Sequence, residues 1–315
     1  MPEISPQIDH PASPRLAQLC ERLAENSSSL SSASDWPRYQ LESCARFGVF
    51  RWFVPAEFGG LGWTPRQIAE GYLQLGTACL TTTFVITQWV AAVKRMLNSE
   101  HDDFAPVQHK LITDLVEGRS HITVGISHLT TSRRHLDRPA LLARRNEAGW
   151  LLDGFSPWVT AASFADHFLI GATMENDDQI LLVVPAATPG VTIDPSQKLV
   201  ALTASCTGAV RFEQATVPNT HLVAGPDPSV LSTSGTAGSG GIQTSALALA
   251  LSNAAIVFIS EQAQRRPELQ EKAASLREQW QTTSESLLQM ADGNPVCSNE
   301  MLRTQANSLV LRSTQ

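Results

Sequence analysis

A run of short, strand-like segments between residues 121 and 223 constrains the fold of this chain more than any other feature. Apolar and β-branched residues come in brief groups there, and glycine, proline and polar residues separate the groups. The segments that we predict as strands are 122–126, 140–144, 150–152, 155–159, 167–173, 180–184 and 209–212. Regular short strands with such turns are typical of a small β-barrel or β-sandwich.

Helical patterns precede and follow this strand region. Apolar residues recur at helical spacing in segments 14–23, 36–47, 66–77 and 81–97, and Thr64-Pro65 is a suitable start for the third. A Gly/Ser/Thr-rich linker at 232–241 leads to further helical segments at 242–266, 267–290 and 299–315. We therefore predict an α+β chain with an N-terminal helical domain (1–120), a central β-barrel or sandwich (121–231) and a C-terminal helical bundle (232–315).

Two apolar patterns in the C-terminal region carry further expectations. Segment 242–266 is apolar nearly all round, so we expect it to be buried, and its apolar run 246–259 is too short to span a bilayer. Leu302, Ala306, Leu309 and Val310 form a stripe that continues to the last residues. We expect this stripe to lack its packing partner, a further helix that is missing or is supplied by another chain, so that the bundle is truncated.

Charge and cysteine content exclude several classes of partner and site. The net charge is −7 with a pI near 5.6, whereas a nucleic-acid-binding protein needs a basic face. The five cysteines are odd in number, widely scattered and without C-x-x-C spacing, which indicates reduced thiols and no zinc site. The first residues lack the basic and apolar regions of a secretion signal, so we expect a soluble, cytoplasmic protein that binds no membrane.

The stretch from residue 149 to 166 is the candidate site. Asp153-Gly154 predicts a tight turn between two strands, which would make a hairpin. Trp158 and Thr160 are two residues apart on the second strand, so we expect both to point to one face. A flat aromatic ring beside a hydroxyl suits a planar cofactor with polar edges. Ordinary packing within a sheet is the alternative interpretation of this pair.

The order of these features resembles the acyl-CoA dehydrogenase family. Helices come first, then a small β domain, then long helices, with Pro-x-Glu-x-Gly-Gly-x-Gly at 55–62 and Asp-Gly-x-x-x-Trp-Val-Thr at 153–160. The resemblance extends from about Leu16 to the end of the chain. It implies FAD as cofactor, with Trp158 packed near the flavin ring and Thr160 reaching the N5 edge.

The resemblance also implies roles for the loop that precedes the hairpin. In the family this loop contacts the flavin pyrimidine and the thioester arm of the substrate, and Gly125, Ser127 and His128 occupy it here. The family's Thr-Glu-Pro is replaced by residues 128–130, His-Leu-Thr. His128 is therefore either a flavin hydrogen-bond partner or an ordinary polar loop residue.

Arginines occupy two further positions that the family uses for phosphate groups. Ser132, Arg133 and Arg134 lie where relatives meet the CoA phosphates, and a solvated surface pair is the alternative. Arg265 lies where relatives carry an arginine for the flavin pyrophosphate of a neighbouring subunit, but the Phe-Gly that follows it in the family is absent. Family members are usually homo-oligomers, and we expect the same here.

The reaction that the resemblance implies is α,β-dehydrogenation of an acyl-CoA thioester with hydride transfer to flavin N5. This reaction needs a carboxylate to remove the α-proton. Relatives supply it from a last helical segment, which would lie beyond Gln315, or from the first C-terminal helix, where this chain has Gln243 and Thr244 and no acid. The catalytic residue is thus unassigned.

Three functions follow from this departure. The first is an acyl-CoA dehydrogenase-type oxidoreductase whose base comes from an absent segment or another chain. The second is a flavin monooxygenase-like member of the same fold, in which His128 and Ser127 assist and no base is required. The third is a non-catalytic homologue that binds flavin or acyl-CoA and acts as a partner subunit.

Overall fold

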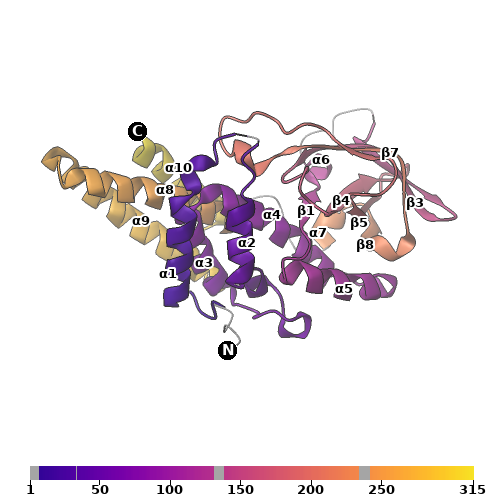
Figure 1. Cartoon of the computed structure of the whole chain (residues 1–315), viewed down its shortest axis with the longest axis horizontal. Helices are drawn as coiled ribbons and strands as arrows, with labels where there is room; N and C mark the ends of the chain where they lie inside the picture. Colours follow the sequence, from indigo (N-terminus) through magenta and orange to yellow (C-terminus); the bar gives the residue numbers. More distant parts are fainter. Residues whose placement is uncertain (1–6, 33, 131–137, 234–241) are drawn as a thin grey trace.

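The computed structural model describes residues 7–32, 34–130, 138–233 and 242–315, and it confirms the predicted α+β order of helices, sheet and helices (Figure 1). Its longer helices are α1 (Pro14–Glu25), α2 (Arg38–Arg46), α3 (Pro65–Ala78), α4 (Leu80–Leu97), α5 (Ala105–Val116), α8 (Ile242–Ala263), α9 (Gln270–Ala291) and α10 (Asn299–Thr314), and α6 (Ser127–Thr130) and α7 (Val230–Thr233) are single turns. The strands are β1 (Ile122–Gly125), β2 (Leu141–Asn146), β3 (Gly149–Val159), β4 (His167–Thr173), β5 (Gln179–Pro185), β6 (Val191–Ile193), β7 (Gly208–Val217) and β8 (Leu222–Asp227).

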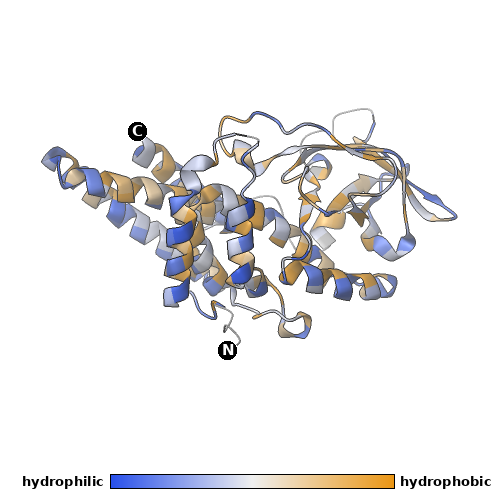
Figure 2. Ribbon diagram, viewed as in Figure 1, coloured by the Kyte–Doolittle hydropathy of each residue, from blue (hydrophilic) through white to orange (hydrophobic). Residues whose placement is uncertain are grey.

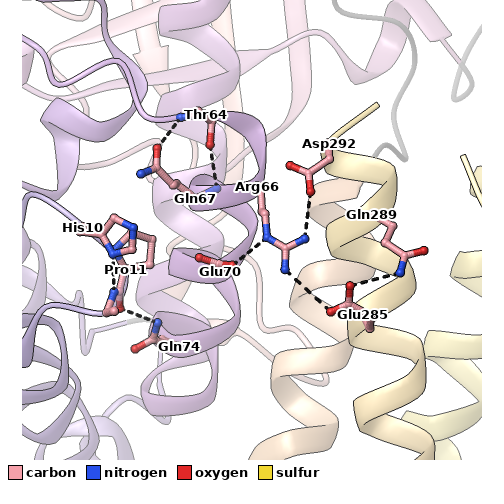
Figure 3. Close-up of polar contacts among 11 residues, drawn as sticks. His10, Pro11, Thr64, Arg66, Gln67, Glu70, Gln74, Glu285, Gln289 and Asp292 are labelled. Carbon is pink, nitrogen blue, oxygen red and sulfur yellow. Dashed lines mark hydrogen bonds and ion pairs between the residues drawn. The ribbon is translucent and has the colours of Figure 1, made fainter. Parts of the chain in front are cut away.

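The start of α3 shows how directly the local sequence determines the N-terminal helices. The backbone N–H of Gln67 donates to Thr64 Oγ1 at 3.3 Å, and the backbone N–H of Thr64 donates to Gln67 Oε1 at 2.9 Å (Figure 3). This capping box satisfies two donors at the helix start. Pro65 occupies the first helical position, where its missing N–H does no harm, so the predicted start of this helix is confirmed.

The glycine-rich segment at 55–62 folds back onto the residues before it. The backbone N–H of Trp63 donates to Trp52 O at 2.9 Å, and a Cβ atom at Gly60 would lie only 1.8 Å from Val54 O. Only glycine therefore fits at this close approach of two backbones. The turn stacks the rings of Trp52 and Trp63 with their centroids 4.1 Å apart, which anchors the segment in the helical core.

The described strands form one mixed sheet in the order β6-β7-β3-β2-β4-β5-β8, and β1 lies parallel to β4. Leu169 and Leu181, on β4 and β5, belong to the large core shared with the helices. Phe168 and Leu182, their chain neighbours, belong to a second core made only of residues from the β domain. Strands that are covered on both faces read as continuous apolar runs, which is why β4 and β5 were recognisable in the sequence.

The predicted turn at Asp153-Gly154 is wrong, because β3 runs unbroken from Gly149 to Val159. Its hairpin partner is β2, and the turn lies at residues 147–148. Gly154 has a φ of +126°, and its register against β7 shifts at this point. A Cβ atom there would lie 2.3 Å from Ala140 O. The glycine therefore makes a β-bulge within a strand, and the two predicted strand segments are one.

The C-terminal helices dock on the N-terminal ones through a close contact between α3 and α8. A Cβ atom at Gly76 would lie 2.7 Å from the Cβ of Ala250, so glycine lets the two helices approach. The indole N–H of Trp280 on α9 donates to Leu249 O at 2.8 Å. The contact therefore joins α3, α8 and α9 into one packed unit.

The expectation that the stripe on the last helix lacks a packing partner is wrong, whereas the expectation of a partial C-terminal domain is confirmed. Leu302, Ala306 and Leu309 on α10 are buried and Val310 is partly buried, and α10 packs against α8 and α9 of the same chain. A stripe at helical spacing shows only that a helix has an apolar face. It does not show which neighbour covers that face, and here the neighbour is the preceding helix pair.

The expectation that α8 is buried is also wrong in part. Its buried residues lie mostly in the first half, whereas Phe258 is 61% exposed and Val257 is exposed as well. Figure 2 shows hydrophobic residues along this helix, outside the β domain. Contrary to the sequence-based estimate of its apolar run, α8 is long and apolar enough to cross a membrane by length and composition alone. Its packing against α3, α9 and α10 is equally that of a core helix.

Candidate functional site

Most of the predicted cofactor residues meet at one edge of the β domain. Gly125 ends β1, Ser127 and His128 lie on α6, Trp158 lies near the end of β3, and Thr160 follows directly after that strand. β1 packs against β3, and α6 packs against both β3 and β4. The structure therefore brings these five residues into one region, although up to 35 positions of sequence separate them.

Gly125 allows β1 to lie close to β3 and β4. A Cβ atom at this position would lie 2.8 Å from Ser156 Oγ and 2.7 Å from Ile170 Cδ1. Such distances are shorter than a Cβ atom tolerates, so a larger residue would require the side chains of Ser156 and Ile170 to shift. The role that the structure gives Gly125 is thus the close packing that positions α6 behind it.

His128 faces the interior of the β domain. Its Nε2–H donates to Gly171 O at 2.7 Å, and its Nδ1 lies 3.4 Å from Ser156 Oγ. Because Nε2 is the donor in the neutral ring, Nδ1 is left to accept from the serine hydroxyl. Both ring nitrogens are used within the β domain, and the side chain is buried. This arrangement favours the interpretation of His128 as a polar group that fixes α6.

The expectation that Trp158 and Thr160 share one strand face is wrong in its premise, because β3 ends at Val159 and its register against β7 shifts between Ser156 and Val159. The two side chains lie in different environments. The indole of Trp158 is 51% exposed, whereas Thr160 is buried with its hydroxyl 3.2 Å from that of Thr207. Thr207 is in turn 2.9 Å from the hydroxyl of Ser205. We call Thr160, Thr207 and Ser205 the hydroxyl series. Because each hydroxyl both donates and accepts, Thr207 can donate to Thr160 and leave the proton of Thr160 for a ligand.

The two residue types fit the flavin that the sequence predicts. An aromatic ring left open at the end of a strand is available to a planar ligand, and a hydroxyl with an oriented proton is available to a ring nitrogen. The backbone supports this arrangement, because Ala161 has a φ of +60° and its N–H donates to Ser205 O at 2.9 Å. That bond ties the residue after Thr160 to the hydroxyl series.

The remaining predicted residues are not part of this region. Ser132, Arg133 and Arg134 lie outside the described residues, so their predicted contact with CoA phosphates stays a prediction. Arg265 is exposed on the turn after α8, where its backbone N–H donates to Gln262 O. It belongs to the C-terminal helices rather than to the edge of the β domain, and its role toward a neighbouring subunit also stays a prediction.

Known proteins resemble the chain in sequence and in fold, although no family model matches it. It is 26% identical to the L-evernosamine nitrososynthase of Micromonospora sp. over 216 residues, which are 64% of this chain and 48% of that protein. It is 23% identical to the benzylmalonyl-CoA dehydrogenase of Aromatoleum aromaticum over 211 residues, 64% of this chain and 53% of the relative. The structure of butyryl-CoA dehydrogenase from Megasphaera elsdenii superposes with a TM-score of 0.82 at 16% identity, covering 95% of this chain and 84% of the other.

The chain is a distant homologue of the acyl-CoA dehydrogenase-like flavoprotein superfamily. This superfamily includes acyl-CoA dehydrogenases and nitrososynthases. The chain spans about half the length of the curated relatives that it matches first. The family resemblance found in the sequence is therefore confirmed, whereas the reaction of this chain is a separate question.

The structure adds residues to the candidate site that were not predicted from the sequence. Ser156, Ser205 and Thr207 hold His128 and Thr160 in place, but they are 28 to 47 positions away from them in sequence. A local signal does exist for two of them. Residues 203–207 are small and mostly polar, and they directly precede β7, which is a composition typical of a loop that supports a site.

The start of α8 is the second position at which the family resemblance predicts a catalytic acid. Its first described residues are Ile242, Gln243, Thr244 and Ser245, and none of these is an acid. Gln243 is partly buried and Thr244 is exposed. Neither an amide nor a hydroxyl takes up a proton at neutral pH, so this turn of the described chain supplies no general base.

Proposed function

We propose that this chain binds FAD and takes part in the α,β-dehydrogenation of an acyl-CoA thioester. The observation that carries the proposal is the exposed indole of Trp158, two residues before Thr160 of the hydroxyl series, at an edge built by β1, α6 and β3. Homology to this superfamily supports it, because the superfamily is one of flavin oxidoreductases. When bound, FAD supplies a hydride acceptor at its N5 atom.

The residues of the chain would divide the work of holding such a cofactor. Trp158 would cover one face of the flavin ring and exclude water there. Thr160 would donate its hydroxyl proton to the N5 edge, oriented by Thr207 behind it. His128 would act indirectly, because its bonds to Ser156 and Gly171 hold α6 against the sheet. The base that removes the α-proton is not assigned to a residue.

Flavin binding is tested by the visible absorption spectrum of the purified protein with and without added FAD. We expect the protein to take up FAD, and we expect Trp158→Ala to weaken the affinity for FAD roughly tenfold or more, the loss typical of truncating a central aromatic anchor. Tyr39→Ala on α2 is the control, because Tyr39 is similarly exposed but lies outside the candidate site. A colourless protein that takes up no FAD would contradict the proposal and favour the non-catalytic partner subunit.

A second candidate function, oxygen activation by the same flavin, has an observation in its favour. The described start of α8 offers no carboxylate, and a reaction at oxygen needs no base for an α-proton. A nitrososynthase is also among the relatives. Anaerobic mixing with acyl-CoAs separates the two functions. Bleaching of the flavin by the acyl-CoA supports dehydrogenation, whereas oxygen consumption that requires an external reductant supports the alternative.

Self-association is part of the proposed function. Phe258 and Val257 form an exposed apolar surface on α8, and contact between this surface and water is unfavourable in free energy. The predicted role of Arg265, just beyond this surface, likewise requires a second subunit. The molar mass in solution, measured by light scattering, tests the assembly, and a monomer at all concentrations would contradict it.

A further inference from the structure

Helix α4 carries a buried cation for which the described chain offers no anion. Arg95 lies in the last turn of α4 and is 8% exposed. Its Nη1 donates to Ala91 O of the same helix at 2.8 Å, and its Nε is fully enclosed without a hydrogen-bond partner. None of the ion pairs among residues 7–32, 34–130, 138–233 and 242–315 involves Arg95.

This arrangement works against the stability of the folded protein. Burial lowers the pKa of Arg95, and no acidic group in the described chain offsets that effect. An arginine cannot lose its proton to escape the cost, so the charge remains. A buried charge without a partner destabilises the fold, and proteins normally pair such a group. A purely structural role therefore does not explain the buried charge of Arg95, whereas a role in binding an anionic ligand does.

The position of Arg95 connects it with the candidate site. α4 packs against β1, which ends at Gly125, and against the one-turn helix Thr203–Ser205 that begins the hydroxyl series. Figure 1 shows α4 passing from the N-terminal helices toward the β domain. The helix that holds the cation thus supports the same edge of the β domain that we assign to the flavin.

A partly open stripe on α4 leads to the cation. Phe84, Gln88 and Ala91 are only partly buried, although the residues between them are buried. They precede Arg95 by 11, 7 and 4 positions, which places all of them on one face of the helix. A ligand lying along this stripe would meet an aromatic ring, an amide and then a positive charge.

We propose that Arg95 binds a carboxylate of the substrate, so that the substrate class is an acyl-CoA whose acyl group carries a second, free carboxylate. This inference rests on the proposed function. One guanidinium matches one carboxylate in both charge and geometry, through two parallel hydrogen bonds. A doubly charged phosphate would leave a negative charge uncompensated in the same buried place. The carboxylate would complete the hydrogen bonding of the group that the fold leaves unpaired.

Binding of two matched ligands tests the inference. Succinyl-CoA and butyryl-CoA have acyl chains of equal length, and only the first ends in a carboxylate. We expect FAD-loaded protein to bind succinyl-CoA roughly tenfold to hundredfold more tightly in calorimetry, the range for a charge-assisted hydrogen-bonded pair. Arg95→Met should abolish this ratio and leave the affinity for butyryl-CoA unchanged. Lys94→Met, which removes the neighbouring cation on the same turn, should keep the ratio.

A measurement without ligand adds a second criterion. Because Arg95→Met removes an unpaired buried charge, we expect the ligand-free variant to melt at a higher temperature than the wild type. Succinyl-CoA should then raise the melting temperature of the wild type and not that of the variant. A ligand-free variant that melts at a lower temperature would overturn the inference, because Arg95 would then be a structural residue.

The failures of the inference and of the proposed function are distinguishable. If the protein takes up FAD and binds both CoA esters equally, the carboxylate assignment is wrong and the proposed function stands. If Arg95→Met weakens both esters alike, the residue contacts the shared CoA moiety, and the assignment is again wrong. If the protein takes up no FAD and binds neither ester, the proposed function fails together with the inference.

Discussion

Helices α4 and α8 are both long and apolar, and they depart from simple burial in opposite directions. α4 is largely enclosed, yet it holds Arg95 in the interior without an anion. α8 has no Asp, Glu, Lys or Arg before Glu261, yet it leaves Phe258 open to solvent. A buried charge is stabilised by a partner of opposite charge, and an exposed apolar face is stabilised by packing against another surface. This contrast is the basis for the proposed ligand at α4 and the proposed second subunit at α8.

The largest expected effect separates the two faces of α8. Leu249 is fully buried where α8 meets the N-terminal helices, so Leu249→Ala should lower the free energy of unfolding by about 2 to 5 kcal/mol. Phe258→Ala removes a larger side chain from the open face and should change the same quantity by less than about 0.5 kcal/mol in the monomer. Chemical denaturation of both variants at low protein concentration measures the difference.

The same pair of variants also tests whether a second subunit packs against the exposed face of α8 at Phe258. If Phe258→Ala costs little at low protein concentration and more at high concentration, a second subunit covers the residue. Equal costs for both variants at every concentration would contradict the assignment of an inner and an outer face on α8. Leu249→Ala serves as the control, because its cost should not depend on protein concentration.

Acid should destabilise the α4 side of the molecule. His121 directly precedes β1, which packs on α4, and burial lowers its pKa to about 4, with Asp166 opposing that shift. The unfolded chain binds the proton near pH 6.5, whereas the folded chain does not. Stability that is present above pH 6.5 is therefore lost as the pH falls toward 4, by at most about 3 kcal/mol.

Unfolding at pH 7 and at pH 5 tests this dependence. His121→Gln should flatten the loss of stability between the two values, while His109→Gln, at an exposed position on α5, should leave it unchanged. Burial also lowers the pKa of His167, so part of the slope will remain in the first variant. An identical slope in all three proteins would show that the loss arises elsewhere. α8 offers no comparable group, because its one titratable side chain, Glu261, is exposed.

The elements that the sequence predicted well are those whose signals are local. Apolar spacing identified α1 to α4, and continuous apolar runs identified β4 and β5, because each pattern reflects burial within a single element. β6 and β8 escaped notice, since the first is only three residues long and the second includes Gly225-Pro226. The turn predicted at Asp153-Gly154 was wrong because a glycine with positive φ occurs in β-bulges as well as in turns.

The candidate site was predictable only where its residues are neighbours in the chain. Trp158 and Thr160 stood out together, but the partners of Thr160 come from a loop 45 positions away or more. Arg95 was not recognised, because Lys94 and Arg95 in the last turn of a helix are the residues that the helix dipole favours there. Only the burial of the side chain, which depends on tertiary packing, distinguishes Arg95 from an ordinary C-terminal charge.

The smallest expected effect concerns the polar link between α3 and α9. Arg66 lies 3.1 Å from Glu70 on its own helix. It also lies 3.8 Å from Glu285 on α9 and 2.9 Å from Asp292, which directly follows α9 (Figure 3). All four side chains are accessible to solvent, so water and salt weaken their attraction. Arg66→Ala should therefore lower the melting temperature only slightly, and added salt should remove most of the difference.

The link still bears on the contrast between α4 and α8, because α9 is one of the helices that pack against α8. If apolar packing holds the C-terminal helices in place, Arg66→Ala will speed hydrogen exchange only near residues 285–292 and leave the rest of α9 protected. Arg144→Ala is the control, since it breaks a similarly exposed pair with Glu175 inside the β domain. A loss of protection from hydrogen exchange throughout α8 and α9 would contradict this expectation. It would mean that surface charges, rather than the contact of Gly76 with Ala250, fix the position of α8.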